Sequence, residues 1–366
     1  MKTIVYRAQH EFVIEARPEP RPGARQILVR PLCVGLCVSD KHWYEGYEAN
    51  GALGAPGGMV GGHEFSAEIV EVGEDVEGFR AGQLVSVDPR VYCGECLPCR
   101  GGVETLCSKG RAFLGATRGY DGGLAELCVV PDYACYPVPD NVTAEVAACV
   151  EPMTCATRSV RHCGLRIGDN VVLLGGEDYN LYATKWLRSA GANRVILVDP
   201  SDRRRNAARS LGAHEVLCPD HGDIVAEIRS SMPFGADIVM VSLEDYVEQS
   251  AGYVRQAFEI CRPQGTVVMV RAYGGDSWAQ VAPMVPWRKE ITIRNFGSFF
   301  GSEPLAGGRA RGDWQLSLDA LGDGRMVAPP LGVNVVKFSD ITTRADVDEI
   351  FRSLPGEHVK TLISMT

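Results

Sequence analysis

The chain has 366 residues, more than one hydrophobic core usually covers, so we expect two domains. Hydrophobic residues make up 45% and charged residues 23% of a chain with a net charge of -9, which excludes a disordered chain and argues against a nucleic-acid partner. The sequence has no apolar run of the roughly 20 residues that cross a bilayer and no apolar signal-peptide core, so we expect a cytoplasmic protein with no membrane partner.

The pattern along the chain predicts a β-rich first domain and an α/β second domain. Strand-like apolar runs lie at 26–32, 67–72, 171–174, 195–198, 238–241 and 266–270, and helical patterns lie at 181–190 and 202–211. The alternation after about Ala156 predicts a doubly wound parallel sheet, the Rossmann arrangement that binds dinucleotides. We place the first domain at 1–155, the second at 156–287, and a return of the chain to the first at 288–366.

Four of the thirteen cysteines crowd into one short segment. They are Cys93, Cys96, Cys99 and Cys107. The cysteine count is odd and no secretion signal precedes it, so metal binding is expected rather than a disulfide framework. Four thiolates can close a tetrahedral zinc shell with no position left for water, which makes this a structural site. An iron–sulfur cluster also takes four thiolates and is the weaker alternative.

A second, dispersed set of residues has the ligand types of a catalytic zinc. Cys37 and His63 offer sulfur and nitrogen, and Glu64 and Glu151 offer oxygen. Such a mixed set leaves one coordination position open for a substrate. The residues do not decide which glutamate binds the metal directly.

Four motifs in this order resemble the zinc-containing medium-chain dehydrogenases, particularly the sorbitol, polyol and butanediol branch. They are GLCVSDKH at 35–42, GGHEFSAEIVEVG at 61–73, the cysteine segment at 93–107 and VEPMTCA at 150–156. The resemblance implies a GroES-like catalytic domain, two zinc ions per chain, and a homodimer or homotetramer. It also implies that Cys37, His63 and either Glu64 or Glu151 bind the catalytic zinc.

Three residues beside Cys37 suit proton movement and ligand orientation. Ser39 and His42 can pass a proton from a buried alcohol to water, and they match the relay positions of the family. Asp40 can orient the ligand histidine with its carboxylate.

The predicted dinucleotide loop departs from the pattern G-x-G-x-x-G. Gly175 and Gly176 follow the first strand, but Glu177 and Asn180 replace the second and third glycines. If the carboxylate of Glu177 faces the pyrophosphate, it weakens cofactor binding. The alternative is a re-routed loop in which Glu177 points to solvent or bonds a ribose hydroxyl. A helix from Leu181 can still direct N–H groups at phosphate.

The choice of nucleotide rests on the residues after the second strand. Asp199 stands where an acidic residue bonds ribose hydroxyls and repels a 2′-phosphate, which favours NAD over NADP. Arg204, in the run of arginines at 203–205, opposes this preference in part.

The leading hypothesis is a zinc-dependent dehydrogenase that moves hydride between NAD(H) and a secondary alcohol or ketone such as a polyol, diol or cyclitol. One alternative is a reductase dedicated to one biosynthetic intermediate. Another is a retired dehydrogenase that serves as a binding or structural protein. Candidates for the substrate pocket are Trp43, Tyr44, Tyr47, Phe113, Phe296, Phe299 and Phe300.

Overall fold

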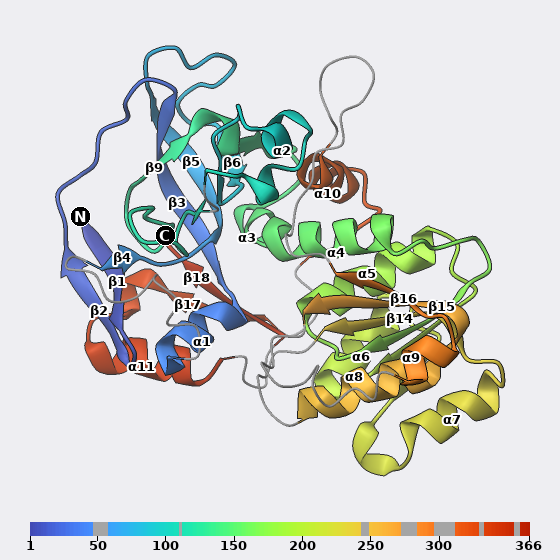
Figure 1. Ribbon diagram of the computed structural model, residues 1–366. Coiled ribbons are helices and arrows are strands. Elements are labelled where there is room, and N and C mark those ends of the chain that lie inside the picture. The colour runs from blue at the N-terminus through green and yellow to red at the C-terminus, as the bar shows by residue number, and fades with distance from the viewer. Residues whose placement is uncertain are drawn as a thin grey trace. The chain divides into compact units, whose positions relative to one another are not determined.

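The computed structural model divides the chain into two compact units (Figure 1). It describes residues 1–46, 58–109, 112–242, 249–271, 284–295, 312–328, 333–354 and 359–366. The first unit comprises Met1–Glu151, Phe300–Pro329 and Val333–Thr366, and the second comprises Pro152–Phe299 and Pro330–Gly332. The break after 151 lies four residues before the one placed from the sequence, and the second unit extends beyond 287. The assignment of catalytic and cofactor roles to these segments stays a prediction.

The first unit is built on β-sheets. The main sheet has the strand order β10-β6-β5-β3-β18-β17, with β9 also paired to β3. Its strands are β3 (Gln26–Leu36), β5 (Glu64–Val72), β6 (Leu84–Val87), β9 (Cys128–Pro131), β10 (Cys135–Pro137), β17 (Val333–Lys337) and β18 (Lys360–Ser364). Smaller sheets are formed by β1 (Lys2–Ala8), β2 (Glu11–Ala16) and β4 (Met59–Val60), and by β7 (Arg90–Val91) and β8 (Ala112–Phe113). Strand β18 brings the C-terminus beside β3, in the middle of this unit.

Short helices connect and cover these sheets. They are α1 (Val38–Glu45), α2 (Leu97–Arg100), α3 (Ala144–Ala148), α10 (Asp313–Gly322) and α11 (Arg344–Arg352), with 3₁₀ turns at Glu104–Leu106, Asp132–Ala134 and Phe338–Asp340. Helix α4 (Val150–His162) begins at the end of the first unit and continues into the second. A group of stacked rings fills part of the core, with Tyr6 and Phe12 centred 3.7 Å apart.

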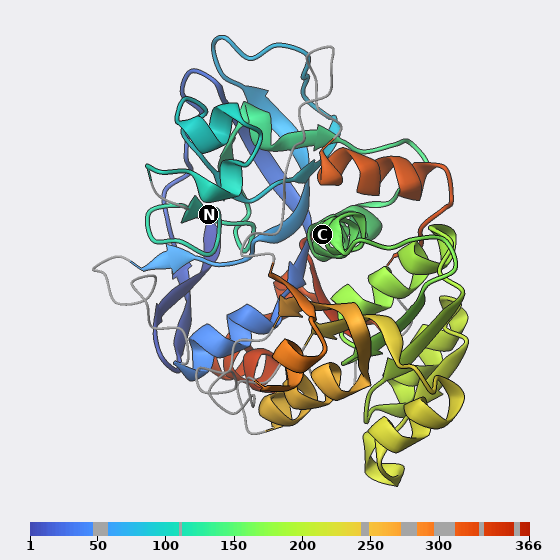
Figure 2. The same cartoon turned by 45° about the vertical axis from the view of Figure 1, so that its right-hand side comes forward.

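The second unit contains the predicted parallel sheet, with helices on both faces (Figures 1 and 2). Its strand order is β13-β12-β11-β14-β15-β16, and every recorded pairing is parallel. The strands are β11 (Asn170–Leu174), β12 (Arg194–Val198), β13 (Glu215–Leu217), β14 (Ala236–Ser242), β15 (Cys261–Arg271) and β16 (Thr292–Asn295). The helices are α5 (Asp178–Ser189), α6 (Asp202–Ser210), α7 (Ile224–Ser231), α8 (Gln249–Ile260) and α9 (Met284–Arg288), with a 3₁₀ turn at Pro219–His221.

The predicted fold class is confirmed. The strand order changes direction at β11, which lies between β12 and β14. In open α/β sheets a ligand binds beyond the carboxyl ends of the strands at such a switch point. Across the described ranges, no helix is long and apolar enough to cross a membrane.

Candidate active site and metal centres

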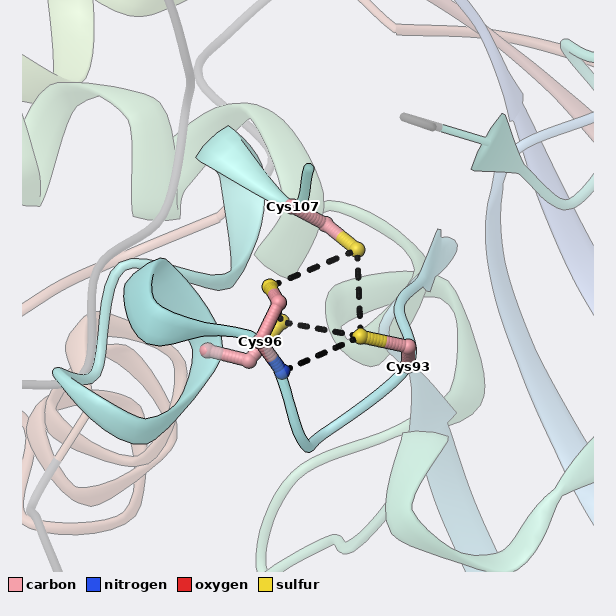
Figure 3. A group of neighbouring side chains, drawn as sticks. Cys93, Cys96 and Cys107 are labelled. Carbon is pink, nitrogen blue, oxygen red and sulfur yellow. Dashed lines mark hydrogen bonds between the residues drawn. The ribbon is translucent and has the colours of Figure 1, made fainter. Parts of the chain in front are cut away.

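The four predicted cysteines meet in one small lobe (Figure 3). Helix α2 and the 3₁₀ turn after it fold the segment so that all four sulfurs lie within 4.8 Å of one another. The Sγ separations are 3.3 Å for Cys96–Cys99, 3.6 Å for Cys93–Cys107, 3.9 Å for Cys93–Cys99 and 4.0 Å for Cys96–Cys107. All four are free thiols.

These separations fit a tetrahedral metal and exclude disulfides. Zinc–sulfur bonds of about 2.3 Å at tetrahedral angles separate neighbouring sulfurs by about 3.8 Å, whereas a disulfide needs about 2.05 Å. The backbone N–H of Cys99, followed by that of Ser108, lowers the pKa of Cys96 to about 5. Burial raises the pKa of Cys99 to about 12, so the thiolate, which is the form that binds zinc, is favoured at Cys96 and not at every sulfur of the lobe.

The mixed ligand set also comes together, from two neighbouring strands. Cys37 follows β3 directly and is the N-cap of α1, while Glu64 begins β5 and His63 precedes it. The register pairs Gly35 of β3 with Glu64 of β5. One ligand atom from each of Cys37, His63 and Glu64 lies within 4.8 Å of the other two, and all three residues are buried.

Buried polar atoms in this cluster suit a metal ion. His63 Nδ1 and both carboxylate oxygens of Glu64 are buried and accept or donate no hydrogen bond within the described part of the chain. A buried carboxylate is costly in free energy unless cations neutralise it, and a metal ion here would add to the charge of Lys360, whose Nζ lies 2.5 Å from Oε2 of Glu64. Sulfur, nitrogen and oxygen donors at this spacing are the ligands that zinc prefers.

Asp40 contacts both the cluster of ligand residues and the core residue Tyr6. Its carboxylate accepts the backbone N–H of Cys37 at 2.8 Å and the hydroxyl of Tyr6 at 3.2 Å. It stands 3.8 Å from Nδ1 of His63, which is beyond hydrogen-bond distance, so its role in orienting that ring stays a prediction. Burial raises the pKa of Asp40 to about 6.

Glu151 is buried beside the cluster but outside the set of three ligand atoms. It lies in the first turn of α4. Burial, and then the nearby negative charge of Glu64, raises the pKa of Glu151 well above its ordinary value. Of the two glutamates left open by the sequence, Glu64 is the one placed with Cys37 and His63.

The relay candidates share helix α1. Ser39 is half-buried and His42 is buried, and their spacing of three residues puts them on one side of the helix. Lys360, which the sequence analysis did not identify, reaches the same cluster from β18 and pairs with Glu64.

The aromatic candidates divide into two groups. The ring of Trp43 is centred 5.9 Å from that of His63, which keeps it near the cluster, and Phe113 is half-buried. Tyr44 is fully buried and donates its hydroxyl to Asp348, so it belongs to the core instead. Tyr47, Phe296, Phe299 and Phe300 lie outside the described residues.

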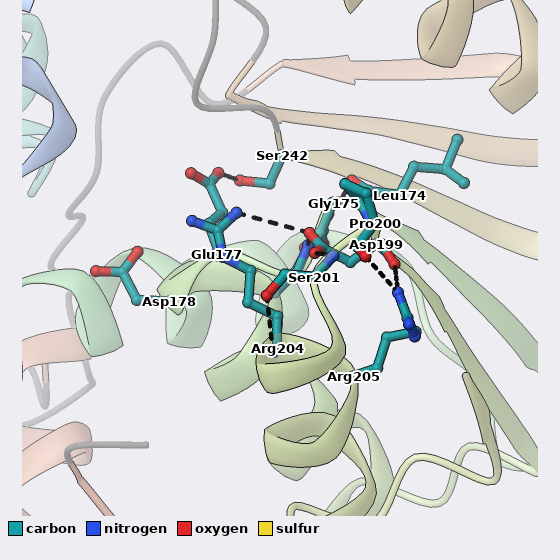
Figure 4. Close-up of polar contacts among 12 residues, drawn as sticks. Leu174, Gly175, Glu177, Asp178, Asp199, Pro200, Ser201, Arg204, Arg205 and Ser242 are labelled. Atoms are coloured by element: carbon teal, nitrogen blue, oxygen red, sulfur yellow. Dashed lines mark hydrogen bonds and ion pairs between the residues drawn. The ribbon is translucent and has the colours of Figure 1, made fainter. Parts of the chain in front are cut away.

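The predicted dinucleotide loop lies between β11 and α5, and its polar groups bond to the backbone of the loop and to residues at the ends of neighbouring strands (Figure 4). Glu177 is the N-cap of α5 and is 1% exposed, and it accepts a hydrogen bond from the hydroxyl of Ser242 at the end of β14. The side-chain amide of Asn180 donates to the carbonyls of Leu174 at 3.1 Å and Gly175 at 2.7 Å. The two residues that replace glycines are thus both fixed within the loop.

The start of α5 corrects one expectation. The helix begins at Asp178 and not at Leu181, and the carboxylate of Asp178 in the first turn favours this start because it complements the helix dipole. Leu181 is therefore buried inside the first turns of α5, against the hydrophobic interior of its unit.

Asp199 closes the loop from the next strand. Its carboxylate accepts the N–H of Gly176 at 2.7 Å and that of Ser201 at 2.8 Å. A Cβ added to Gly176 would lie 3.0 Å from that of Asp199, so this close approach favours glycine. Arg204 lies 3.6 Å from Asp199, whereas Arg205 is buried and donates to the carbonyls of Asp199 and Pro200.

Replacing Glu151 with Gln should change how stability depends on pH in the metal-free protein. The raised pKa means that folded Glu151 keeps its proton at pH values where the unfolded chain, with a pKa of about 4.3, has lost it. The free energy of unfolding should therefore fall as pH rises from about 4.3 through the folded pKa. Thermal unfolding at pH 5 and pH 8 in a chelator should show a smaller fall for Glu151→Gln. An equal fall in both proteins would contradict this.

Comparison with known proteins identifies the family. Residues 23–140 match the alcohol dehydrogenase GroES-like domain, and residues 181–321 match the zinc-binding dehydrogenase domain. D-xylulose reductase A of Aspergillus oryzae is 30% identical over 365 residues, which covers 97% of this chain and 94% of that protein.

Solved structures agree with the sequence relatives. The 2R,3R-butanediol dehydrogenase of Bacillus subtilis is 26% identical with a TM-score of 0.79, covering 100% of this chain and 99% of that one. A zinc-binding dehydrogenase of Sinorhizobium meliloti, solved bound to NADP, is 25% identical with a TM-score of 0.83, covering 99% and 98%. The chain belongs to the zinc-binding, nicotinamide-dependent medium-chain dehydrogenases, in their sorbitol- and polyol-dehydrogenase-like branch.

Proposed function

We propose that this dehydrogenase oxidises a secondary alcohol of the polyol or diol class, or reduces the matching ketone, with NAD(H) as the hydride carrier. The observation that carries the proposal is the buried cluster of Cys37, His63 and Glu64, whose donor atoms suit zinc. The substrate class is supported by the xylulose reductase and butanediol dehydrogenase relatives. A substrate panel followed by NADH absorbance tests it, and turnover of no polyol, diol or corresponding ketone would contradict it.

We propose two zinc ions per chain, with different tasks. The four-cysteine lobe would hold a structural ion, and Cys37, His63 and Glu64 would hold the catalytic one. When bound there, zinc acts as a Lewis acid that lowers the pKa of an alcohol. Glu151 stands beside the cluster as a further carboxylate, and Asp40 steers the ring of His63.

The protein's own residues would then remove the alcohol proton. The hydroxyl of Ser39 would accept this proton while donating its own to the imidazole of His42, three residues further along α1. In the second unit, Asp199 would bond a ribose hydroxyl and repel a 2′-phosphate, which supports NAD over NADP. Its two hydrogen bonds to backbone N–H groups leave acceptor capacity on the carboxylate.

We further propose that 1–155 and 288–366 form the catalytic domain and 156–287 the cofactor domain. The assembly is proposed to be a homodimer or homotetramer in the cytoplasm. Sedimentation of the purified protein tests the oligomeric state.

A chelator should remove the metal of the mixed site before that of the cysteine lobe. A chelator should abolish activity before the protein unfolds, because the mixed site has an open face whereas the cysteine lobe has a closed thiolate shell. Metal analysis should find two zinc ions in active protein. Cys37→Ala and His63→Ala should each retain one zinc and lose turnover. Active protein that contains one zinc or none would contradict the assignment.

The His42→Ala variant should lower the rate mainly below neutral pH. There the exported proton most needs a base to accept it, and the loss should be on the order of tenfold or more. The measurement is a pH profile of kcat, with the exposed His10→Ala of the same unit as the control. A profile parallel to that of the native enzyme would remove His42 from the relay.

Replacing Glu177 with Gln should tighten NADH binding several-fold. The carboxylate is buried at the N-terminus of α5, where the nucleotide diphosphate is expected, and about 1.4 kcal/mol of repulsion corresponds to tenfold in Kd. Gln keeps an oxygen that can accept the hydroxyl of Ser242. Fluorescence titration measures the affinity, and Glu227→Gln at an exposed position of α7 is the control. Weaker binding to Glu177→Gln would show that the carboxylate contacts the cofactor favourably.

A further inference from the structure

Lys360 and Glu64 form a buried ion pair at the proposed catalytic zinc site. The side chain of Glu64 is 0% exposed and that of Lys360 is 3% exposed, and Nζ of Lys360 lies 2.5 Å from Oε2 of Glu64. Removing both charges from water is favourable only when their geometry is close and well defined. The ammonium of Lys360 neutralises Oε2 of Glu64, whereas Oε1 has no hydrogen-bond partner among the described residues.

The sheet register explains how this pair forms. Strand β3 lies between β18 and β5, with Thr361 opposite Leu36 and Gly35 opposite Glu64. Because β3 separates them, β18 and β5 lie roughly 9.6 Å apart, which is twice the spacing of adjacent strands. Their side chains can therefore meet only by passing over β3. A long lysine and a glutamate can do this if the middle strand has no side chain in the way.

Gly35 provides that space on β3. A Cβ placed on Gly35 would lie 2.4 Å from Oε2 of Glu64 and 3.2 Å from Cε of Lys360. The first distance is shorter than any ordinary contact, so a side chain here would displace the carboxylate. The ion pair therefore depends on three strands: Lys360 comes from β18, Glu64 comes from β5, and Gly35 of β3 leaves room for both side chains.

We propose that Lys360 is a positioning residue for the catalytic metal: it holds Oε2 of Glu64 and thereby presents Oε1 to the ion. This arrangement makes Glu64, rather than Glu151, the carboxylate ligand, in agreement with the cluster of three ligand atoms. The inference rests on the proposed zinc site and adds to it the residue that fixes its oxygen ligand. Lys360 itself touches neither substrate nor metal in this role.

Metal affinity of the native protein and of Lys360→Met tests the proposal without using activity. Zinc binding is measured by competition with a chromophoric chelator, and the ligand set is followed by the absorption bands of Co²⁺ placed in the site. Lys360→Met should bind zinc at the mixed site at least tenfold more weakly and shift the Co²⁺ bands, while the cysteine lobe keeps its ion. Unchanged or tighter binding would overturn the proposal, because it would mean that Lys360 is irrelevant or competes with the metal.

A double-mutant cycle keeps the test valid if Lys360→Met folds poorly. The Glu64→Gln and Lys360→Met pair removes both buried charges and leaves neither one unpaired. If Lys360 acts through Glu64, adding Lys360→Met to Glu64→Gln should leave the zinc affinity unchanged. A further loss of tenfold in the double variant would overturn the proposed route.

The Gly35→Ala variant tests the position of the Glu64 carboxylate without changing any charge. It keeps both charged groups but moves the Glu64 carboxylate, so it should also weaken zinc at the mixed site. Gly252→Ala in α8 is the control, since its added Cβ meets no atom within 4 Å. Native affinity in Gly35→Ala would contradict the positioning role. Native protein that holds no zinc at the mixed site would instead refute the proposed function, and this inference with it.

Discussion

The first unit buries two carboxyl groups in one place, and its stability depends on whether they are protonated or neutralised by cations. The carboxylates of Glu64 and Glu151 are removed from water beside Cys37, and such groups are costly to bury without a cation. The ammonium of Lys360 neutralises Glu64 in part. The donor atoms of Cys37, His63 and Glu64 suit a metal ion that would supply further positive charge. The raised pKa of Glu151 has the same origin, because burial and the charge of Glu64 act together on it.

Strand β3 positions the residues that carry this charge. It pairs with β5 on one side and β18 on the other, and its end leads directly into the N-cap of α1 at Cys37. One strand therefore fixes the spacing of Cys37, Glu64 and Lys360. Because β18 is formed by the last residues of the chain, the site is complete only when the C-terminus has returned to the first unit.

The parts of the site that could be predicted from sequence are those whose signal is local. The cysteine lobe follows from spacing within 93–107, and the parallel sheet follows from apolar runs that alternate with helical patterns. Lys360 has no such signal: a lysine in a short apolar strand acquires its role only from the register of β18 against β3. Tyr44 shows the opposite error, since its nearness to Cys37 in sequence suggested a pocket whereas α1 turns it into the core.

The dinucleotide loop shows why a sequence departure need not remove a function. A glycine loop leaves its N–H groups available to phosphate, whereas here the N–H of Gly176 bonds Asp199 and the amide of Asn180 bonds two carbonyls at the end of β11. The loop is therefore stabilised from within, and Ser242 fixes the carboxylate of Glu177. Affinity for a dinucleotide is spread over its phosphates, riboses and rings, so one unfavourable charge of about 1.4 kcal/mol changes Kd about tenfold and does not abolish binding. The departure at Glu177 is thus compatible with a working dehydrogenase.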